Sequence, residues 1–375
     1  MRWQAAPAPA GPVTPVELFF DMVFVFTLTQ LTSLLEKDLS LAGVGRILLL
    51  FGVLWWMYGG YAWLTNHVPP RRVSQKLLLF AGMAGFLVAA VGMPRAFDGT
   101  GVVFGLGYLV VICVHLLLFT QSDAVAGVLR LAPFNVGAAL LILAAGFVEG
   151  PAVYALWIAA FVLMAVIPYL IPRYSWVGGA AAFHVAAEHF VERHGLLVLV
   201  ALGESVVAIG MGVDAEHLTA ATIGAIILAL VLPGELFWTY FSDARAAEHA
   251  LAGTEIGARS LLSTRAYFFA HIPLLLGIVV TAAGIHSAIA HPGEPVEWRS
   301  ASALGGGVAL FLLGYADFQR AMGIGSPRSR IVAAAAVLAT IPIGAKASAG
   351  IHLASVVAIL AAMLVIDPSR PLEQD

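Results

Sequence analysis

The run Arg193-His-Gly-Leu-Leu-Val-Leu-Val-Ala-Leu-Gly-Glu-Ser-Val-Val-Ala-Ile-Gly-Met-Gly-Val213 decides the fold class of this chain. It has about the 20 apolar residues that an α-helix needs to cross a bilayer. Its middle carries Glu204. An ionisable side chain costs about 2.5–3.5 kcal/mol at the centre of a membrane helix, so it is a functional-site hypothesis by default. We therefore expect a membrane-spanning helix with a functional carboxylate in it.

The composition of the whole chain agrees with a membrane protein. Of its 375 residues, 61% are hydrophobic and only 11% are charged, whereas a soluble domain carries about 25% charged residues. The single cysteine, Cys113, excludes a disulfide framework and a cysteine-based zinc site. We find no phosphate-binding glycine loop, nucleophile elbow or dinucleotide fingerprint. Nucleotide-dependent and serine-hydrolase functions are therefore not expected, and neither is a nucleic-acid partner.

Apolar runs of spanning length recur along the chain and predict an all-α, polytopic integral membrane protein of about twelve transmembrane helices. The expected spans are residues 15–35, 46–64, 76–93, 101–119, 131–148, 152–171, 195–213, 219–241, 266–290, 302–321, 329–345 and 351–366. Residues 242–265 are expected to form a long polar loop.

The basic residues indicate how these spans are oriented. With twelve spans, one side of the membrane holds fourteen Lys and Arg residues and the other holds five: Lys37, Arg46, Arg95, Arg299 and Lys346. Basic residues accumulate on the cytoplasmic side. We therefore expect a multi-pass protein of the inner (cytoplasmic) membrane with both termini in the cytoplasm.

The sequence also predicts an internal repeat. Trp238 lies 182 residues after Trp56 in a similar aromatic run, and Glu204 lies 183 residues after Asp21. These offsets predict two tandem six-helix membrane repeats, at residues 15–175 and 176–366. Because six is an even number, the repeats are expected to be parallel. Residues 1–14 and 367–375 are expected to be cytoplasmic tails.

Two intramembrane carboxylates are the leading candidates for chemistry. Thr14 and Glu17, on either side of Pro15, predict a capping box at the start of the first helix. Asp21 lies about 10 Å further along that helix, which is too deep for a cap. If the repeat holds, Asp21 and Glu204 are equivalent, and a pair of such carboxylates suits cation binding or a proton relay. The alternative is that both only fix helix packing.

A second candidate group precedes the quoted run, in a polar helix expected over residues 180–194. His184, Glu188 and Glu192 share one helical face, and His189 lies on an adjoining face. They could line a cytoplasmic mouth, ligate a divalent metal, or act as acid–base groups in an enzyme on lipid or isoprenoid. The spacing matches no common metal motif, so we expect no cofactor and keep a divalent metal as a minor alternative.

A third candidate is Glu235, which follows Pro233 and Gly234 inside an apolar run. Proline frees a backbone carbonyl one turn earlier, and the glycine permits local unwinding. Broken helices of this kind form ion and solute sites in transporters, although a plain kink explains the same residues. Upstream, Tyr61 and Trp63 are expected to lie in an interfacial aromatic belt.

Two blocks resemble the signature stretches of the bacterial low temperature requirement A (LtrA) proteins. They are Val16-Glu-Leu-Phe-Phe-Asp-Met-Val-Phe-Val-Phe-Thr-Leu-Thr-Gln30 and, after Glu192-Arg-His-Gly-Leu, Ala201-Leu-Gly-Glu-Ser-Val-Val-Ala-Ile-Gly210. The resemblance covers essentially the whole chain and departs at His194, where an aromatic residue is common. It implies a membrane location and marks Glu17, Asp21, Gln30, Gly203, Glu204 and Ser205 as pattern residues. Phe19 to Phe24 is also similar to the opening of a family of potassium and proton channels built from six-helix repeats.

These observations favour a channel or transporter for a small ion or solute, embedded in the lipid bilayer and compatible with a homo-oligomer. Its ion- or substrate-binding residues would be Asp21, Glu204, Ser205, Glu235 and Gln30. The alternatives are a membrane-embedded enzyme acting through residues 184–192, and a non-catalytic scaffold or sensor.

Overall fold

The computed structural model describes residues 12–121, 125–170, 185–213 and 218–367, and every regular element in these ranges is helical. The predicted all-α fold is confirmed. In the first half the helices are α1 (Pro15–Lys37), α2 (Leu41–His67), α3 (Val73–Gly92), α4 (Gly101–Phe119), α5 (Val125–Ala145), α6 (Pro151–Phe161) and α7 (Ile167–Leu170), with a 3₁₀ turn η1 at Met93–Arg95 and a π-helical segment η2 at Val162–Val166.

The second half contains the remaining helices: α9 (Ala187–Gly212), α10 (Ala220–Phe241), α11 (Ala244–Ala252), α12 (Ile256–Ser263), the π-helical η3 (Thr264–Phe269), α13 (His271–Ala290), α14 (Trp298–Met322), α15 (Pro327–Ala339), α16 (Ile341–Lys346) and α17 (Ala349–Ile366).

Eleven helices in the described residues are long and apolar enough to cross a membrane, and a shorter apolar helix, Pro151–Val166, occupies the remaining predicted position. The span predicted at 329–345 corresponds to the candidate span Pro327–Lys346, which is interrupted at residue 340, between α15 and α16. Pro342 explains the break, because a helix usually ends at or before the residue that precedes a proline. The loop predicted over 242–265 is wrong, since most of it forms α11 and α12.

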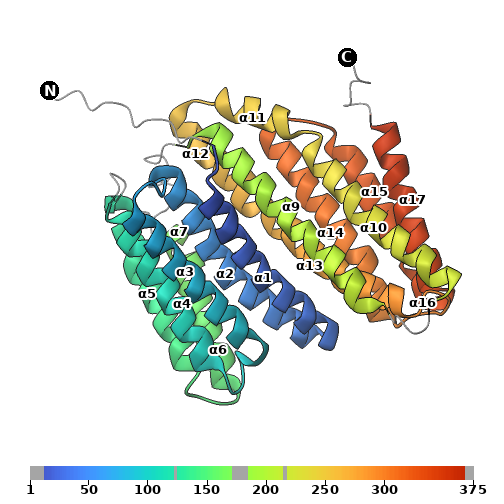
Figure 1. The fold of residues 1–375 in the computed structure, drawn as a ribbon, viewed down its shortest axis with the longest axis horizontal. Coiled ribbons are helices and arrows are strands. Elements are labelled where there is room, and N and C mark those ends of the chain that lie inside the picture. The colour runs from blue at the N-terminus through green and yellow to red at the C-terminus, as the bar shows by residue number, and fades with distance from the viewer. Residues whose placement is uncertain (1–11, 122–124, 171–184, 214–217, 368–375) are drawn as a thin grey trace.

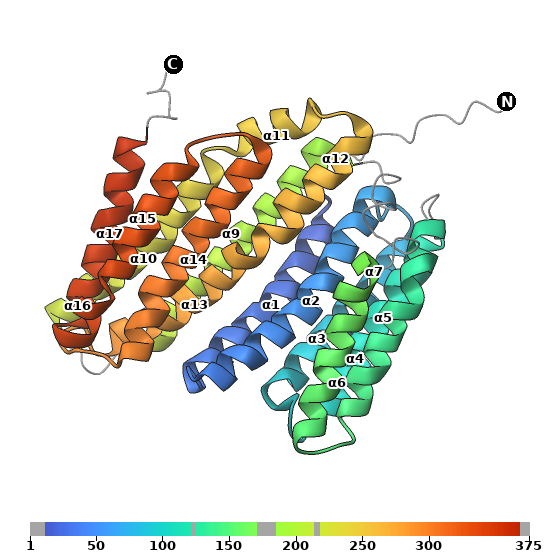
Figure 2. The ribbon, with the colours of Figure 1, turned by 180° about the vertical axis from the view of Figure 1, so that it is seen from behind.

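The helices form two groups that lie side by side (Figures 1 and 2). One contains α1 to α7 and the other contains α9 to α17, with α1 beside α9 where the groups meet. Asp21 contacts Arg193, and eight residues further on Thr29 contacts Glu204, so α1 and α9 run in the same direction. The start of α1 and the end of α17 lie at the same end of the molecule.

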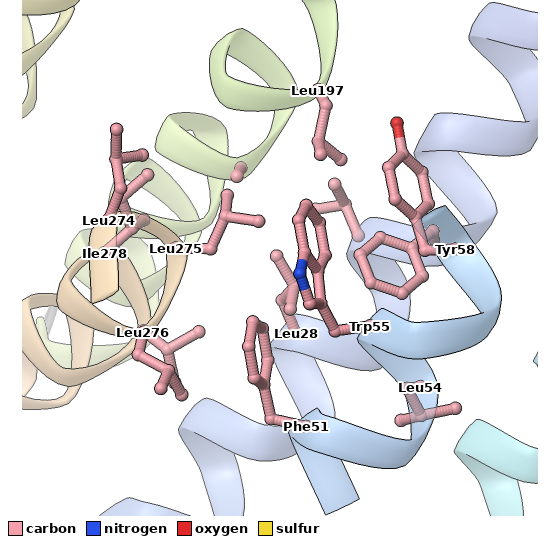
Figure 3. Packing of buried hydrophobic residues seen from close by; sticks show 14 of the residues in the cluster. Leu28, Phe51, Leu54, Trp55, Tyr58, Leu197, Leu274, Leu275, Leu276 and Ile278 are labelled. Carbon is pink, nitrogen blue, oxygen red and sulfur yellow. The ribbon is translucent and has the colours of Figure 1, made fainter. Parts of the chain in front are cut away.

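A buried aromatic and aliphatic layer joins the two groups. Figure 3 shows Trp55 and Phe51 of α2 facing Leu197 of α9 and Leu275 of α13. Trp55 is 1% exposed, and its indole nitrogen donates a hydrogen bond of 3.1 Å to the backbone oxygen of Phe268 in η3. In a membrane such contacts stabilise by van der Waals packing rather than by the hydrophobic effect. The two groups are therefore packed as one body at this level.

Close glycine contacts recur between corresponding helices of the two groups. A Cβ on Gly85 of α3 would come within 2.9 Å of the backbone oxygen of Gly107 in α4, and a Cβ on Gly277 of α13 within 2.8 Å of that of Gly307 in α14. Residue 277 is 192 after 85, and 307 is 200 after 107. The repeat stays a prediction, and these matching small-residue contacts support it. Its proposed boundary at residues 175 and 176 lies outside the described residues.

Three ionisable or aromatic positions differ from their expected surroundings. Tyr61 and Trp63 are 0% and 5% exposed, so the interfacial belt predicted for them is wrong. Tyr61 donates instead to the backbone oxygen of Val111 at 2.8 Å, because a buried hydroxyl needs a partner. Asp367, the first residue of the predicted tail 367–375, is buried and pairs with the buried Arg330.

Candidate functional site

The candidate site is built on α1 and α9. The described part of the predicted polar helix 180–194 and the predicted span 195–213 form one continuous helix, α9; His184 lies outside the described residues. Glu17 and Asp21 are four residues apart on α1, as are His189 and Arg193 on α9. Residues at this spacing share a helical face. Since α1 packs along α9, the two pairs meet.

Arg193 is the centre of the resulting cluster. Its Nη1 lies 3.1 Å from Oε1 of Glu17 and also donates to Oγ1 of Thr65, while its Nη2 lies 3.2 Å from Oδ1 of Asp21. Arg193 and Asp21 are fully buried, and Glu17 is 1% exposed. A buried charge is tolerated when it is paired and hydrogen-bonded. This geometry satisfies that requirement for the two terminal nitrogens of the guanidinium.

Two further side chains complete the hydrogen bonds of the carboxylates. The Nε2 atom of His189 lies 3.1 Å from Oε1 of Glu17, and the Tyr58 hydroxyl donates to Oδ1 of Asp21 at 3.0 Å. Glu17 also accepts, through Oε2, from the backbone nitrogen and hydroxyl of Thr14 at 2.8 and 2.7 Å. Thr14 and Glu17 therefore cap α1 as expected, and Glu17 serves the cluster as well.

We call Glu17, Asp21, His189, Arg193 and Tyr58 the Arg193 cluster. The two carboxylates and the one guanidinium of this cluster have a net charge of −1 when all three are ionised. Three of its polar atoms, Oδ2 of Asp21, Nδ1 of His189 and Nε of Arg193, make no hydrogen bond within the described residues.

Glu204 has a different environment. It is 5% exposed, and one carboxylate oxygen accepts a 2.5 Å hydrogen bond from the Thr29 hydroxyl. Within the described part of the chain it makes no ion pair. Its neighbour Ser205 is fully buried, with no hydrogen bond to its hydroxyl in the same ranges. Gln30 and Gly203 are half-buried next to this pair.

The structure does not bring Asp21 and Glu204 together. Asp21 is level with Arg193, and Glu204 is level with Thr29, which lies eight residues or about 12 Å further along α1. Between the two levels α1 presents the buried side chains of Phe24, Val25 and Leu28. The carboxylates share an interface but stand at different depths in it.

Glu235 is on α10, apart from Asp21 on α1 and Glu204 on α9. It is 9% exposed, and its Oε2 atom makes no hydrogen bond within the described residues. The local unwinding expected at Pro233 and Gly234 is not observed, because α10 continues as an α-helix through both residues. Membrane helices tolerate proline because neighbouring helices and local adjustments satisfy the backbone group that the proline frees.

The remaining candidate side chains, those of Glu188, His189 and Glu192, point to two different parts of the molecule. Glu188 and Glu192 are exposed and line a groove of about 390 Å³ between α9, α10 and α11. His189 points the other way, to Glu17. In the described residues no three His, Cys, Asp or Glu side chains are grouped closely enough to hold a metal ion. The predicted polar face therefore splits into a groove and a buried cluster.

Sequence reasoning missed the far end of the interface. Glu36 of α1 and His286 of α13 line an open cavity of about 420 Å³, together with Glu294 and Glu297. The roles of Arg193, Tyr58 and Thr29 were missed too. The i, i+4 spacing of Glu17 and Asp21 and of His189 and Arg193 was a signal that could have paired them.

One known protein family matches nearly the whole length of the chain. A family model described as bacterial low temperature requirement A protein (LtrA) matches residues 12–365. A curated protein of Rhizobium meliloti (strain 1021), named uncharacterized protein RA0937, is 30% identical over 311 residues, which cover 80% of this chain and 75% of the relative. No solved structure matches the chain.

Proposed function

The chain belongs to the bacterial low temperature requirement A family of membrane proteins, and we propose that it moves a small cation, most readily the proton, across the inner membrane. The carriers are acidic side chains along the interface between α1 and α9. We further propose that both termini face the cytoplasm. Arg193 and Arg330 are among the fourteen basic residues of the predicted cytoplasmic side, but they are buried and paired. Without these two, that side still has twelve basic residues, and the opposite side has five.

One observation carries the proposal: ionisable and hydroxyl side chains follow α1 through the depth of the molecule. Glu17, Asp21, Thr29 with its partner Glu204, and Glu36 occur in this order. Glu17 and Glu36 are 19 residues apart, which is about 28 Å along a helix. The hydrocarbon core of a bilayer is about 30 Å thick. A chain of exchangeable groups over this distance is the arrangement that a proton relay needs.

The Arg193 cluster would exchange protons with the end of the molecule where α9 begins. Its net charge of −1 allows it to take up one proton on a carboxylate. Glu36 and the cavity that it lines would serve the opposite end. Glu204 lies between the two and has a hydroxyl in place of a counter-charge. A carboxyl without a cationic partner is the group in the series most suited to cycle between its neutral and charged forms.

The apolar side chains between Asp21 and Thr29 would form the gate. Phe24 and Leu28 of α1 are at most 1% exposed and separate the two polar levels. A proton would cross this layer only when α1 and α9 shift enough for water to bridge about 12 Å. Such a resting barrier would prevent an uncontrolled leak.

The enzyme alternative needs residues 184–192 to converge on one substrate. Among its described members, Glu188 and Glu192 face the groove and His189 faces Glu17. We therefore do not propose an enzyme. The scaffold alternative remains the direct competitor of ion transport, and the same experiment separates them.

The test is ion flux into proteoliposomes that contain the full-length protein. We expect wild-type flux to exceed that of protein-free vesicles under a proton, K⁺ or Na⁺ gradient, and Glu204→Gln to lower it at least about tenfold. Glu149→Gln, an exposed carboxylate between α5 and α6, is the matched control and should leave flux unchanged. Wild-type flux equal to that of empty vesicles under all three gradients would rule out the transport function.

A further inference from the structure

The groove between α9, α10 and α11 has features that ion transport along α1 does not use. Its volume of about 390 Å³ lies within the range of small-molecule sites. Its rim carries the carboxylates of Glu188, Glu192 and Glu248, and its wall includes the rings of Tyr240, Tyr267 and Phe318. One guanidinium, that of Arg245, also lines it. Three carboxylates against one guanidinium leave the groove negative.

The aromatic wall of the groove is rigid. The Tyr267 ring packs against Phe318 with 5.1 Å between ring centroids, against His271 at 5.3 Å and against His194 at 4.9 Å. Tyr240 is held by a hydrogen bond of 2.9 Å between its hydroxyl and Nε2 of His271. Fixed aromatic rings beside carboxylates recognise organic ammonium groups, because the ring faces attract a cation while the acids supply its counter-charge.

The Tyr267 hydroxyl is a second and independent sign of a ligand. Tyr267 is 1% exposed and lines the groove, but its hydroxyl makes no hydrogen bond within the described residues. Its neighbour Tyr240 shows the contrasting case, with its hydroxyl bonded to His271. A buried hydroxyl without a partner is costly, and a polar group on a bound molecule would satisfy it.

The spacing of the acids argues against a metal ion as the occupant. No three His, Asp or Glu side chains in the described residues are close enough to ligate one, and a metal needs several ligand atoms within about 2.0–2.6 Å. Carboxylates spread around an aromatic wall fit a diffuse organic cation instead.

We propose that this groove binds a small organic cation, an alkylammonium group that carries a hydrogen-bonding substituent. The ammonium group lies against Tyr240, Tyr267 and Phe318 and is neutralised by Glu188, Glu192 and Glu248. The substituent bonds the Tyr267 hydroxyl. This inference does not depend on the proposed ion transport, because its groups are not those of the α1 series.

The first test is calorimetric titration of the full-length protein, in a non-ionic detergent, with choline. The control ligand is 3,3-dimethylbutan-1-ol, which has the shape of choline but no charge. We expect choline to bind at millimolar concentration or below and the neutral analogue to bind at least about tenfold more weakly. Equal binding of the two, or no binding of choline, would overturn the proposal.

Variants then locate the site. The triple change Glu188→Gln, Glu192→Gln and Glu248→Gln should weaken choline binding at least about tenfold, whereas Glu149→Gln should not. Tyr267→Phe keeps the ring and removes only the hydroxyl, so it should weaken choline binding and leave tetramethylammonium binding unchanged. Unaltered choline binding by a folded triple variant, with folding checked by gel filtration and circular dichroism, would contradict the assignment.

A competition experiment identifies the source of the ammonium group. Dihexanoylphosphatidylcholine carries the same headgroup on a lipid. If it displaces choline at a lower concentration than free choline does, the groove holds a lipid headgroup. If it fails to displace choline, the ligand is a free solute. The neutral analogue 3,3-dimethylbutan-1-ol is the control. If it displaces choline at the same concentration as free choline or dihexanoylphosphatidylcholine does, recognition of a cation is refuted.

Discussion

Two buried acidic sites on the same pair of helices have different partners. In the Arg193 cluster, Glu17 and Asp21 share one guanidinium and also accept hydrogen bonds from His189 and Tyr58. About 12 Å away along α1, Glu204 has a single hydroxyl bond from Thr29. A paired carboxylate holds helices together at a cost that its partners offset, whereas an unpaired one is free to exchange a proton. We therefore expect Glu17 and Asp21 to anchor α1 to α9 in addition to their proposed part in proton exchange, and Glu204 to contribute little to anchoring.

The largest expected effect is the loss of the cationic partner. Arg193→Met leaves two carboxylates buried without their counter-charge, and we expect a loss of about 3–5 kcal/mol in the free energy of unfolding. The measurement is unfolding in detergent followed by circular dichroism. Arg328→Met, which removes an exposed arginine, is the control. A loss below about 1 kcal/mol for Arg193→Met would mean that the cluster does not join α1 to α9.

Asp21→Asn is expected to have the next largest effect. It keeps the shape of the side chain but weakens charged hydrogen bonds to Arg193 and Tyr58, so about 1.5–3 kcal/mol should be lost. The same unfolding assay measures it. The double variant Asp21→Asn with Arg193→Met should lose less than the sum of the single losses, because the two residues interact. Additive losses would contradict a direct ion pair.

Removing the hydroxyl beside Glu204 should cost less. Thr29→Val has nearly the same shape and removes one hydrogen bond, worth about 0.6 kcal/mol on average inside a membrane protein. Glu204→Gln should change stability by a similar amount or less, since amide and hydroxyl can still bond. A loss above about 3 kcal/mol for Glu204→Gln would show an anchoring role and remove the contrast with Asp21.

The smallest effect is expected outside the spans, at Asp38 between α1 and α2. Hydrogen bonds from the side chain and backbone of Ser40 lower the pKa of Asp38. Its contribution to stability is therefore present above the ordinary carboxyl pKa of about 3.9 and is lost as the pH falls through the lowered value. Melting curves of wild type and Asp38→Asn should differ slightly at pH 6 and converge in acid. A difference that grows in acid would have the wrong sign.

The sequence by itself determined that this protein lies in a lipid bilayer, that it is helical and to which family it belongs. Apolar runs of about 20 residues specify spanning helices because the hydrocarbon core leaves no other way to satisfy the backbone. The capping box of Thr14 and Glu17 was equally local, as it needs only residues three apart. Depth in the membrane also marked Asp21 and Glu204 as unusual before any contact was known.

Only the tertiary structure decided what each charge touches. Arg193 was predicted to lie on the cytoplasmic side, at the end of the polar helix 180–194, but this segment is part of α9 and Arg193 is buried against Glu17 and Asp21. Repeat offsets made Asp21 and Glu204 equivalent, whereas the contacts of α1 with α9 set them at different depths. The physical reason is that the partner of a buried charge depends on the register and rotation of two packed helices. If one helix shifts by a few residues along the other, both the register and the rotation change, but the hydropathy of each helix stays the same.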